Sequence, residues 1–190
     1  MSDVTPKQKP GTLASARRRP WTTLIALVVA GVAVGWLAWS LFTPSATYER
    51  TLPDLSFERL EGGQLQLTSL TGEPVVINLW ATWCLPCLRE LPMMANMVRR
   101  EPGVRFVFAN QGEQRAVVES YLAEHSEMAL QGVVLDQAQS LNVEFQTHGL
   151  PITLFFDDRG NHVHSHIGEL TEVELFNYVI DLKAGNLNPI

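Results

Sequence analysis

The stretch WATWCLPCLRELP, residues 80–92, contains both cysteines of the chain, Cys84 and Cys87. Its first residue, Trp80, is also the last residue of the apolar run EPVVINLW, which is β-rich and long enough for a buried central strand. The residues after Cys84 read as a helix, with Pro92 as an interior kink. A strand that leads into a helix through the cysteines predicts that the pair opens the helix. Amide N–H groups and the helix dipole stabilise a thiolate at that position.

A Cys-x-x-Cys pair can be a redox dithiol, half of a metal site or a structural disulfide. A tetrahedral zinc site needs four ligands, and the chain has only two cysteines. A disulfide that closes so short a loop constrains little of the unfolded chain. We therefore predict redox chemistry without metal or cofactor, with Cys84 as the exposed attacking thiolate and Cys87 as the buried resolving thiol. Trp83 is expected to cover one side of this site.

The rest of the chain after residue 51 alternates between strand and helix patterns. Two hairpins are predicted, one around Gly62-Gly63 and one around the turn at residues 158–160. Because a hairpin cannot join parallel strands, the central sheet should be mixed. The pattern predicts an α/β domain over residues 52–190. It closes with an amphipathic helix that has Val173, Phe176, Val179 and Ile180 on one face.

An uncharged apolar segment precedes this domain, from Trp21 to Phe42. As a helix it would be about 33 Å long, enough to cross the ~30 Å hydrocarbon layer of a membrane. Five basic residues precede it, whereas Arg50 is the only cation close behind it. This predicts a basic cytoplasmic tail (1–20), a transmembrane anchor (21–42) and a tether (43–51), with the remainder outside the cytoplasm. The alternative is a cleaved secretory signal, whose apolar region would be shorter, about 7–15 residues.

The part after the apolar segment is acidic. Residues 43–190 contain 9 Lys and Arg against 19 Asp and Glu, a net charge of −10. This charge argues against binding to nucleic acid or to anionic lipid.

The motif NLWATWCLPCLRELP, with Glu90 and Pro92 in C-x-x-E-x-P, is followed by NQGE and GLPIT. In this combination the chain resembles the thioredoxin-fold proteins, most closely the TlpA/ResA-like group of membrane-anchored thiol-disulfide oxidoreductases of bacteria. The resemblance implies a thioredoxin-like fold with an N-terminal β-hairpin extension, a periplasmic catalytic domain and a single-pass anchor in the inner membrane. It also implies that Pro151 is a cis-proline facing the cysteines.

The direction of electron flow is predicted from Leu85 and Pro86, which lie between the cysteines and carry no cation. A strong oxidant needs an over-stabilised thiolate, so we predict a reductase. The resemblance implies a membrane thiol transporter of the DsbD/CcdA type as electron donor. It implies exported clients such as apocytochrome c or copper-site assembly factors. The alternatives are a disulfide oxidase or isomerase, and a non-catalytic copper chaperone that uses the cysteine pair with a histidine.

Asn78 stands six residues before Cys84, where thioredoxins carry a buried acidic residue. Asparagine cannot accept a proton, so Cys87 requires another acceptor, either water or a side chain such as Glu90. Elsewhere, His162, His164 and His166 should share one face of a strand. They form either a metal site or, as we expect, the polar face of an edge strand. His148 either tunes Cys84 or, as we expect, lies in solvent.

Overall fold

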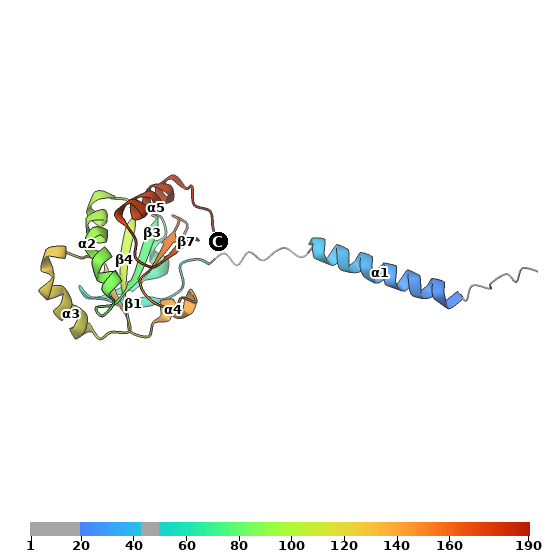
Figure 1. Ribbon diagram of the computed structural model, residues 1–190, viewed down its shortest axis with the longest axis horizontal. Helices are drawn as coiled ribbons and strands as arrows, with labels where there is room; N and C mark the ends of the chain where they lie inside the picture. The colour runs from blue at the N-terminus through green and yellow to red at the C-terminus, as the bar shows by residue number, and fades with distance from the viewer. Residues whose placement is uncertain (1–19, 43–49) are drawn as a thin grey trace, which may run out of the picture. The chain divides into compact units, whose positions relative to one another are not determined.

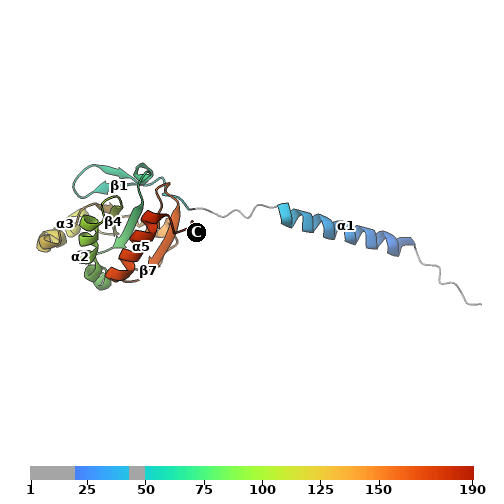
Figure 2. The same ribbon diagram turned by 90° about the horizontal axis from the view of Figure 1, so that it is seen from above.

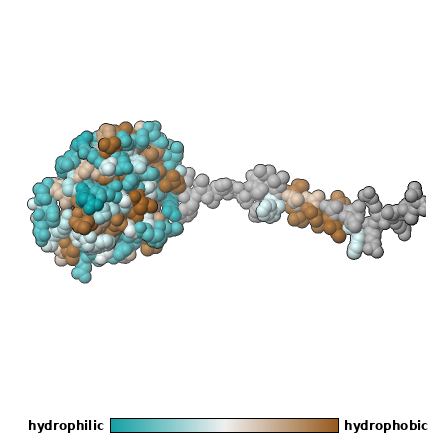
Figure 3. All heavy atoms as spheres, in the orientation of Figure 1, coloured by the Kyte–Doolittle hydropathy of each residue, from teal (hydrophilic) through white to brown (hydrophobic). Residues whose placement is uncertain are grey.

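The computed structural model describes residues 20–42 and 50–190, and the chain divides into two compact units, 1–46 and 47–190. The first unit contributes helix α1 (Pro20–Phe42), over the range predicted to be helical. The α1 side chains that the structure describes are apolar (Figure 3). Within the described ranges, no helix combines the length and apolarity that crossing a membrane requires. The anchor therefore stays a prediction from the sequence. Most residues of the predicted tail and tether lie outside the described part.

The second unit is built around a mixed sheet of seven strands in the order β2-β1-β5-β4-β3-β6-β7 (Figure 1). Strand β4 pairs in parallel with both β3 and β5, whereas β1–β2, β1–β5, β3–β6 and β6–β7 are antiparallel. The predicted mixed sheet and both hairpins are confirmed. The elements are β1 (Ser56–Arg59), β2 (Gln64–Gln66), η1 (Leu67–Leu70), β3 (Val75–Trp80), α2 (Leu85–Arg100), β4 (Arg105–Gln111), α3 (Arg115–Glu124), η2 (Ser126–Met128), β5 (Val133–Asp136), α4 (Ser140–Glu144), β6 (Ile152–Phe156), β7 (His162–Ile167) and α5 (Glu172–Ala184).

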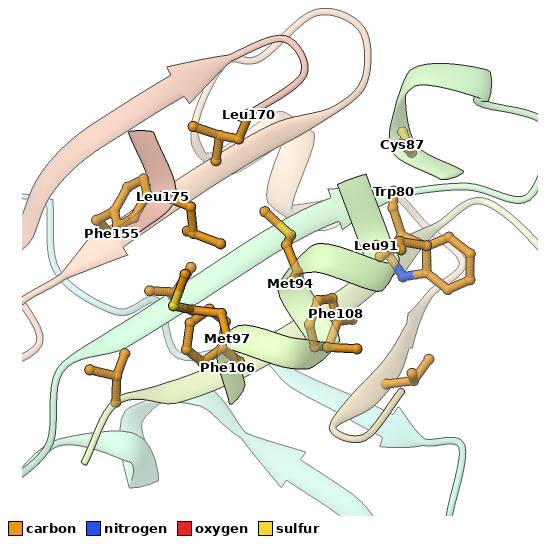
Figure 4. Close-up of a cluster of buried hydrophobic side chains, with 14 of the residues drawn as sticks. Trp80, Cys87, Leu91, Met94, Met97, Phe106, Phe108, Phe155, Leu170 and Leu175 are labelled. Atoms are coloured by element: carbon orange, nitrogen blue, oxygen red, sulfur yellow. The ribbon is translucent and has the colours of Figure 1, made fainter. Parts of the chain in front are cut away.

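Buried side chains form two clusters, which draw on alternate residues of the central strand β3. One cluster joins the sheet to α2, α3 and α5, and the other joins it to η1 and α4. Figure 2, turned by 90°, shows α2 and α5 beside each other against the sheet. The first cluster includes both cysteines, and Cys87 lies at one end of it, beyond Trp80 and Leu91 (Figure 4). The redox pair is therefore set into the core between α2 and the sheet.

Of the four residues predicted to share the apolar face of α5, only Val179 is buried. Leu175, Val179 and Leu182 are buried, spaced four and three residues apart. Val173, Phe176 and Ile180 are 70%, 37% and 42% exposed. The helix has apolar residues on two faces, and contact with α2 and the sheet selects the one that contains Leu175.

The prediction that the three histidines of β7 share a face is also wrong. The β6–β7 pairing shifts register between Phe155 and Phe156, which is the mark of a β-bulge. The ring of His162 therefore contacts Phe145 and Phe156, whereas His164 and His166 contact the ring of Tyr178. In the part of the chain that is described, no three His, Cys, Asp or Glu side chains are placed to hold a metal ion.

Candidate active site

The cysteines lie where the carboxyl end of β3 passes into α2. Cys84 is the N-cap of α2, and its Sγ accepts a hydrogen bond from the Cys87 amide at 3.3 Å. The two cysteines are joined by a disulfide, with their Cα atoms 5.3 Å apart. The predicted strand–Cys–helix arrangement is confirmed. In the reduced protein, the same amide and the helix dipole would face a thiolate on Cys84.

Cys84 was predicted to be exposed, and in the structure its side chain is buried. In the disulfide form Cys84 is only 4% exposed, against 0% for Cys87, so both sulfurs are largely covered. Trp83 and Leu85, on either side of Cys84, are 67% and 68% exposed. Two large apolar side chains in solvent next to the disulfide form a surface suited to an apolar or extended polypeptide.

Glu90 lies one helical turn after Cys87 and is 2% exposed. Its Oε1 accepts a hydrogen bond from Asn78 Nδ2 at 2.8 Å, and its Oε2 accepts one from the Leu170 amide at 2.8 Å. Asn78 Nδ2 also donates to Thr153 Oγ1 at 3.1 Å. Burial raises the pKa of Glu90 to about 7, although both hydrogen bonds favour the carboxylate. Asn78 stands where thioredoxins carry a buried acidic residue, and here it binds the carboxylate of Glu90, which comes from α2.

The peptide bond between Leu150 and Pro151 is cis, as the resemblance implied. Pro151 directly precedes Ile152, which pairs with Leu79 near the carboxyl end of β3. The proline segment therefore lies at the same end of the sheet as the cysteines. The Pro151 carbonyl accepts a hydrogen bond from the Gly168 amide at 3.0 Å. Within the described residues, the backbone of Leu150 has no partner, which leaves its N–H and C=O free to pair with another chain.

A second carboxylate, Glu113, holds the loop before the cysteines and was not singled out by the sequence. Glu113 Oε2 accepts from the Thr82 amide at 2.8 Å and from Asn110 Nδ2 at 2.7 Å. Its Oε1 accepts from Thr82 Oγ1 at 2.5 Å. Glu113 belongs to the NQGE motif, which supported the resemblance but did not reveal which residue the glutamate would contact.

His148 is exposed in the loop before the cis-proline. Within the described part of the chain, no hydrogen bond or ring contact joins it, or any other histidine, to the cysteines. This agrees with the expectation that His148 lies in solvent.

Known proteins with similar sequences are thiol-disulfide oxidoreductases, which agrees with a cysteine pair at this position. Residues 48–180 match the family model described as Redoxin. The chain belongs to the Redoxin family. It is 30% identical over 175 residues to the thiol-disulfide oxidoreductase ResA of Halalkalibacterium halodurans, covering 88% of this chain and 98% of that one. It is 30% identical over 135 residues to ResA of Bacillus subtilis, covering 70% and 74% of the two chains.

Solved structures show the same fold. The chain aligns with the structure of MTB dsbF in its mixed oxidized and reduced forms, with a TM-score of 0.62 and 26% identity, over 70% of this chain and 99% of that one. This Redoxin is therefore a ResA-like thiol-disulfide oxidoreductase with the pair Cys84–Cys87. The thioredoxin-like fold predicted for the domain is confirmed.

Proposed function

We propose that this Redoxin is a membrane-anchored reductase of disulfides in exported proteins. The observation that carries the proposal is the position of Cys84 at the N-cap of α2, with the Cys87 amide directed at its sulfur. The exposed Trp83 and Leu85 beside it offer an apolar contact for a client segment. The free backbone of Leu150 offers strand-like pairing to the same segment.

The proposed reaction begins with the reduced dithiol. The Cys84 thiolate attacks one sulfur of the client disulfide, forms a mixed disulfide and releases the other client sulfur as a thiolate. The Cys87 thiol then passes its proton to the Glu90 carboxylate and attacks Cys84 Sγ. This attack forms the Cys84–Cys87 disulfide and releases the second client thiolate. The client gains two electrons, the dithiol loses two, and protons from Glu90 and solvent complete the client thiols.

The direction rests on the charges around the pair. Leu85 and Pro86 provide no cation, and the nearby Arg89 is paired with Glu169. The helix N-terminus alone then stabilises the thiolate, which is less than a strong oxidant requires. A copper chaperone would need a histidine beside the cysteines, and among the described residues no hydrogen bond or ring contact joins a histidine to them.

The reduction potential tests this direction. We expect the full chain in detergent, equilibrated with dithiothreitol or glutathione, to have a potential near or below about −270 mV, the value of thioredoxin. The oxidised fraction can be followed by alkylation of the free thiols. A potential near about −120 mV, typical of a strong oxidant, would instead make the protein a disulfide donor.

The site of action follows from the sequence before the domain. The uncharged segment 21–42 and the five basic residues before it support an inner-membrane anchor with the catalytic domain in the periplasm. A dithiol outside the cytoplasm needs a supply of electrons, which we assign to a membrane thiol transporter of the DsbD/CcdA type.

The anchor can be tested by extracting membranes with alkaline carbonate. We expect the full chain to stay in the pellet and a variant that lacks residues 1–46 to appear in the soluble fraction. Release of the full chain by carbonate would contradict the anchor and leave the redox chemistry to be judged by the potential.

A further inference from the structure

Gly168, Glu169 and Leu170 are three consecutive residues of the connection between β7 and α5, residues 168–171, and the backbone amides of Gly168 and Leu170 contact different parts of the candidate site. The Gly168 amide donates to the Pro151 carbonyl at 3.0 Å. The Leu170 amide donates to Glu90 Oε2 at 2.8 Å. The two amides are two residues apart, so the cis-proline segment and the buried carboxylate are held by one short turn.

The middle residue of this turn is fixed from the surface by α2. Arg89 Nε donates to Glu169 Oε1 and Oε2 at 3.0 and 3.1 Å, and Arg89 Nη2 also contacts Oε2. Such a two-pronged pair restricts orientation more than a single ionic contact does. Arg89 and Glu90 are adjacent on α2, so the helix holds the turn at two neighbouring points.

We propose that the turn Gly168–Leu170 positions Glu90 and the Pro151 segment as one unit, and that the Arg89–Glu169 ion pair fixes this turn. The proposal rests on the functions proposed above for Glu90 and Pro151. In this arrangement, Arg89 and Glu169 are positioning residues that act through the two backbone amides. Neither side chain is bonded to a cysteine in the described structure.

The arrangement links proton transfer at Glu90 to the client-binding segment. An amide hydrogen bond to a carboxylate is stronger than one to a neutral carboxyl group. When Glu90 takes the proton of Cys87, the Leu170 amide loses part of its bond, and the turn that also holds Pro151 is loosened. Closure of the Cys84–Cys87 disulfide would thus coincide with a weaker hold on the segment that binds the client, which favours its release.

The test is Arg89→Lys in the full chain, in detergent and in the disulfide form. Lysine keeps the charge but cannot make the two-pronged contact. Two quantities are measured by NMR: hydrogen exchange of the Gly168 and Leu170 amides, and the titration midpoint of the Glu90 carboxyl. We expect both amides to exchange about three- to fivefold faster, the size of a surface ion pair. The Glu90 midpoint should rise by a few tenths of a pKa unit, because its amide donor is held less firmly and the Glu169 carboxylate, whose charge already raises this pKa, is less closely paired.

Arg100→Lys is the matched control. Arg100 is also an exposed arginine on α2, and its Nη1 makes a single 2.6 Å contact with Glu172 at the start of α5. This variant should leave both amides and the Glu90 midpoint as in the wild type. The proposal is overturned if Arg89→Lys behaves like the wild type, or if only one of the two amides changes. Amide exchange and the Glu90 midpoint are both measured without a client. If the protein has no reductase activity, the proposed function is refuted, whereas the proposal about the turn is still decided by these two measurements.

Discussion

Cys87→Ala is expected to leave the protein covalently attached to its clients. Without the second thiol, the mixed disulfide formed by Cys84 has no internal nucleophile to resolve it. Reductase turnover should fall roughly 10³-fold or more, as when one member of a catalytic unit is removed. Adducts that disappear on treatment with dithiothreitol should be visible by non-reducing electrophoresis and identifiable by mass spectrometry.

The matched control is Cys84→Ala, which keeps Cys87 but removes the cysteine at the N-cap of α2. This variant should lose turnover equally and form no adducts, since Cys87 is 0% exposed. Adducts through Cys87 in Cys84→Ala would reverse the assigned roles. The absence of adducts in both variants would argue against the dithiol mechanism.

Glu90→Gln is expected to change how the stability of the oxidised protein depends on pH. The pKa of Glu90 is about 7 in the folded protein, against an ordinary value of 4.5. Between these values the folded state binds more protons than the unfolded state, so the free energy of unfolding falls as pH rises. The contribution is fully present below pH 4.5 and is lost by pH 7. It amounts to about 3 kcal/mol over that window.

His162 acts in the opposite direction over nearly the same range. Burial lowers its pKa from 6.5 to about 4, so the unfolded state binds the extra proton between these values. The stability that His162 contributes is present above pH 6.5 and is lost as pH falls to 4. In the wild type these two contributions oppose each other between pH 4.5 and 6.5. Glu90→Gln removes one of them, so the free energy of unfolding of the variant relative to the wild type should rise by about 3 kcal/mol from pH 4.5 to pH 7.

Urea unfolding of the oxidised protein at several pH values between 4.5 and 7.5 measures this difference. Glu172→Gln, which removes an exposed carboxylate at the start of α5, is the control and should follow the wild type. The side-chain amide introduced by Glu90→Gln can still accept from the Leu170 amide. Its NH2 group can donate to Asn78 Oδ1 once the Asn78 amide turns over, because Asn78 Nδ2 now faces this position and Asn78 Oδ1 is buried without a partner in the described structure. The variant should therefore fold. A curve parallel to the wild type would mean that Glu90 titrates near its ordinary pKa in the folded protein.

The features predicted correctly from the sequence depend on neighbouring residues. The strand before Cys84 and the helix after it follow from an apolar run and from helical spacing, and the structure has β3 and α2 there. The hairpin around Gly62 and Gly63 follows from the two glycines, which both have positive φ angles. The cis bond at Pro151 came from the resemblance, because X-Pro bonds adopt either isomer and the amino acid alone does not decide between them.

The incorrect predictions concern which side chains of α5 and β7 face the core, because local sequence patterns do not determine this. The spacing of apolar residues in α5 permits two buried faces, and packing in the first cluster selects Leu175, Val179 and Leu182. The spacing of the histidines in β7 predicts one shared face, and a bulge in the pairing with β6 separates His162 from the other two. In both elements, the neighbouring strand or helix decides which side chains are buried.

The redox chemistry of this protein is already present in its local sequence, because two cysteines that open a helix after a buried strand activate one sulfur and keep the second within reach. How Glu90, the proposed proton acceptor, is held depends instead on contacts between distant segments. Asn78 and Glu90 are 12 residues apart, and Glu90 and Leu170 are 80 apart. Burial among these partners, rather than sequence spacing, raises the pKa of Glu90, because desolvation depends on every segment that packs around the carboxylate.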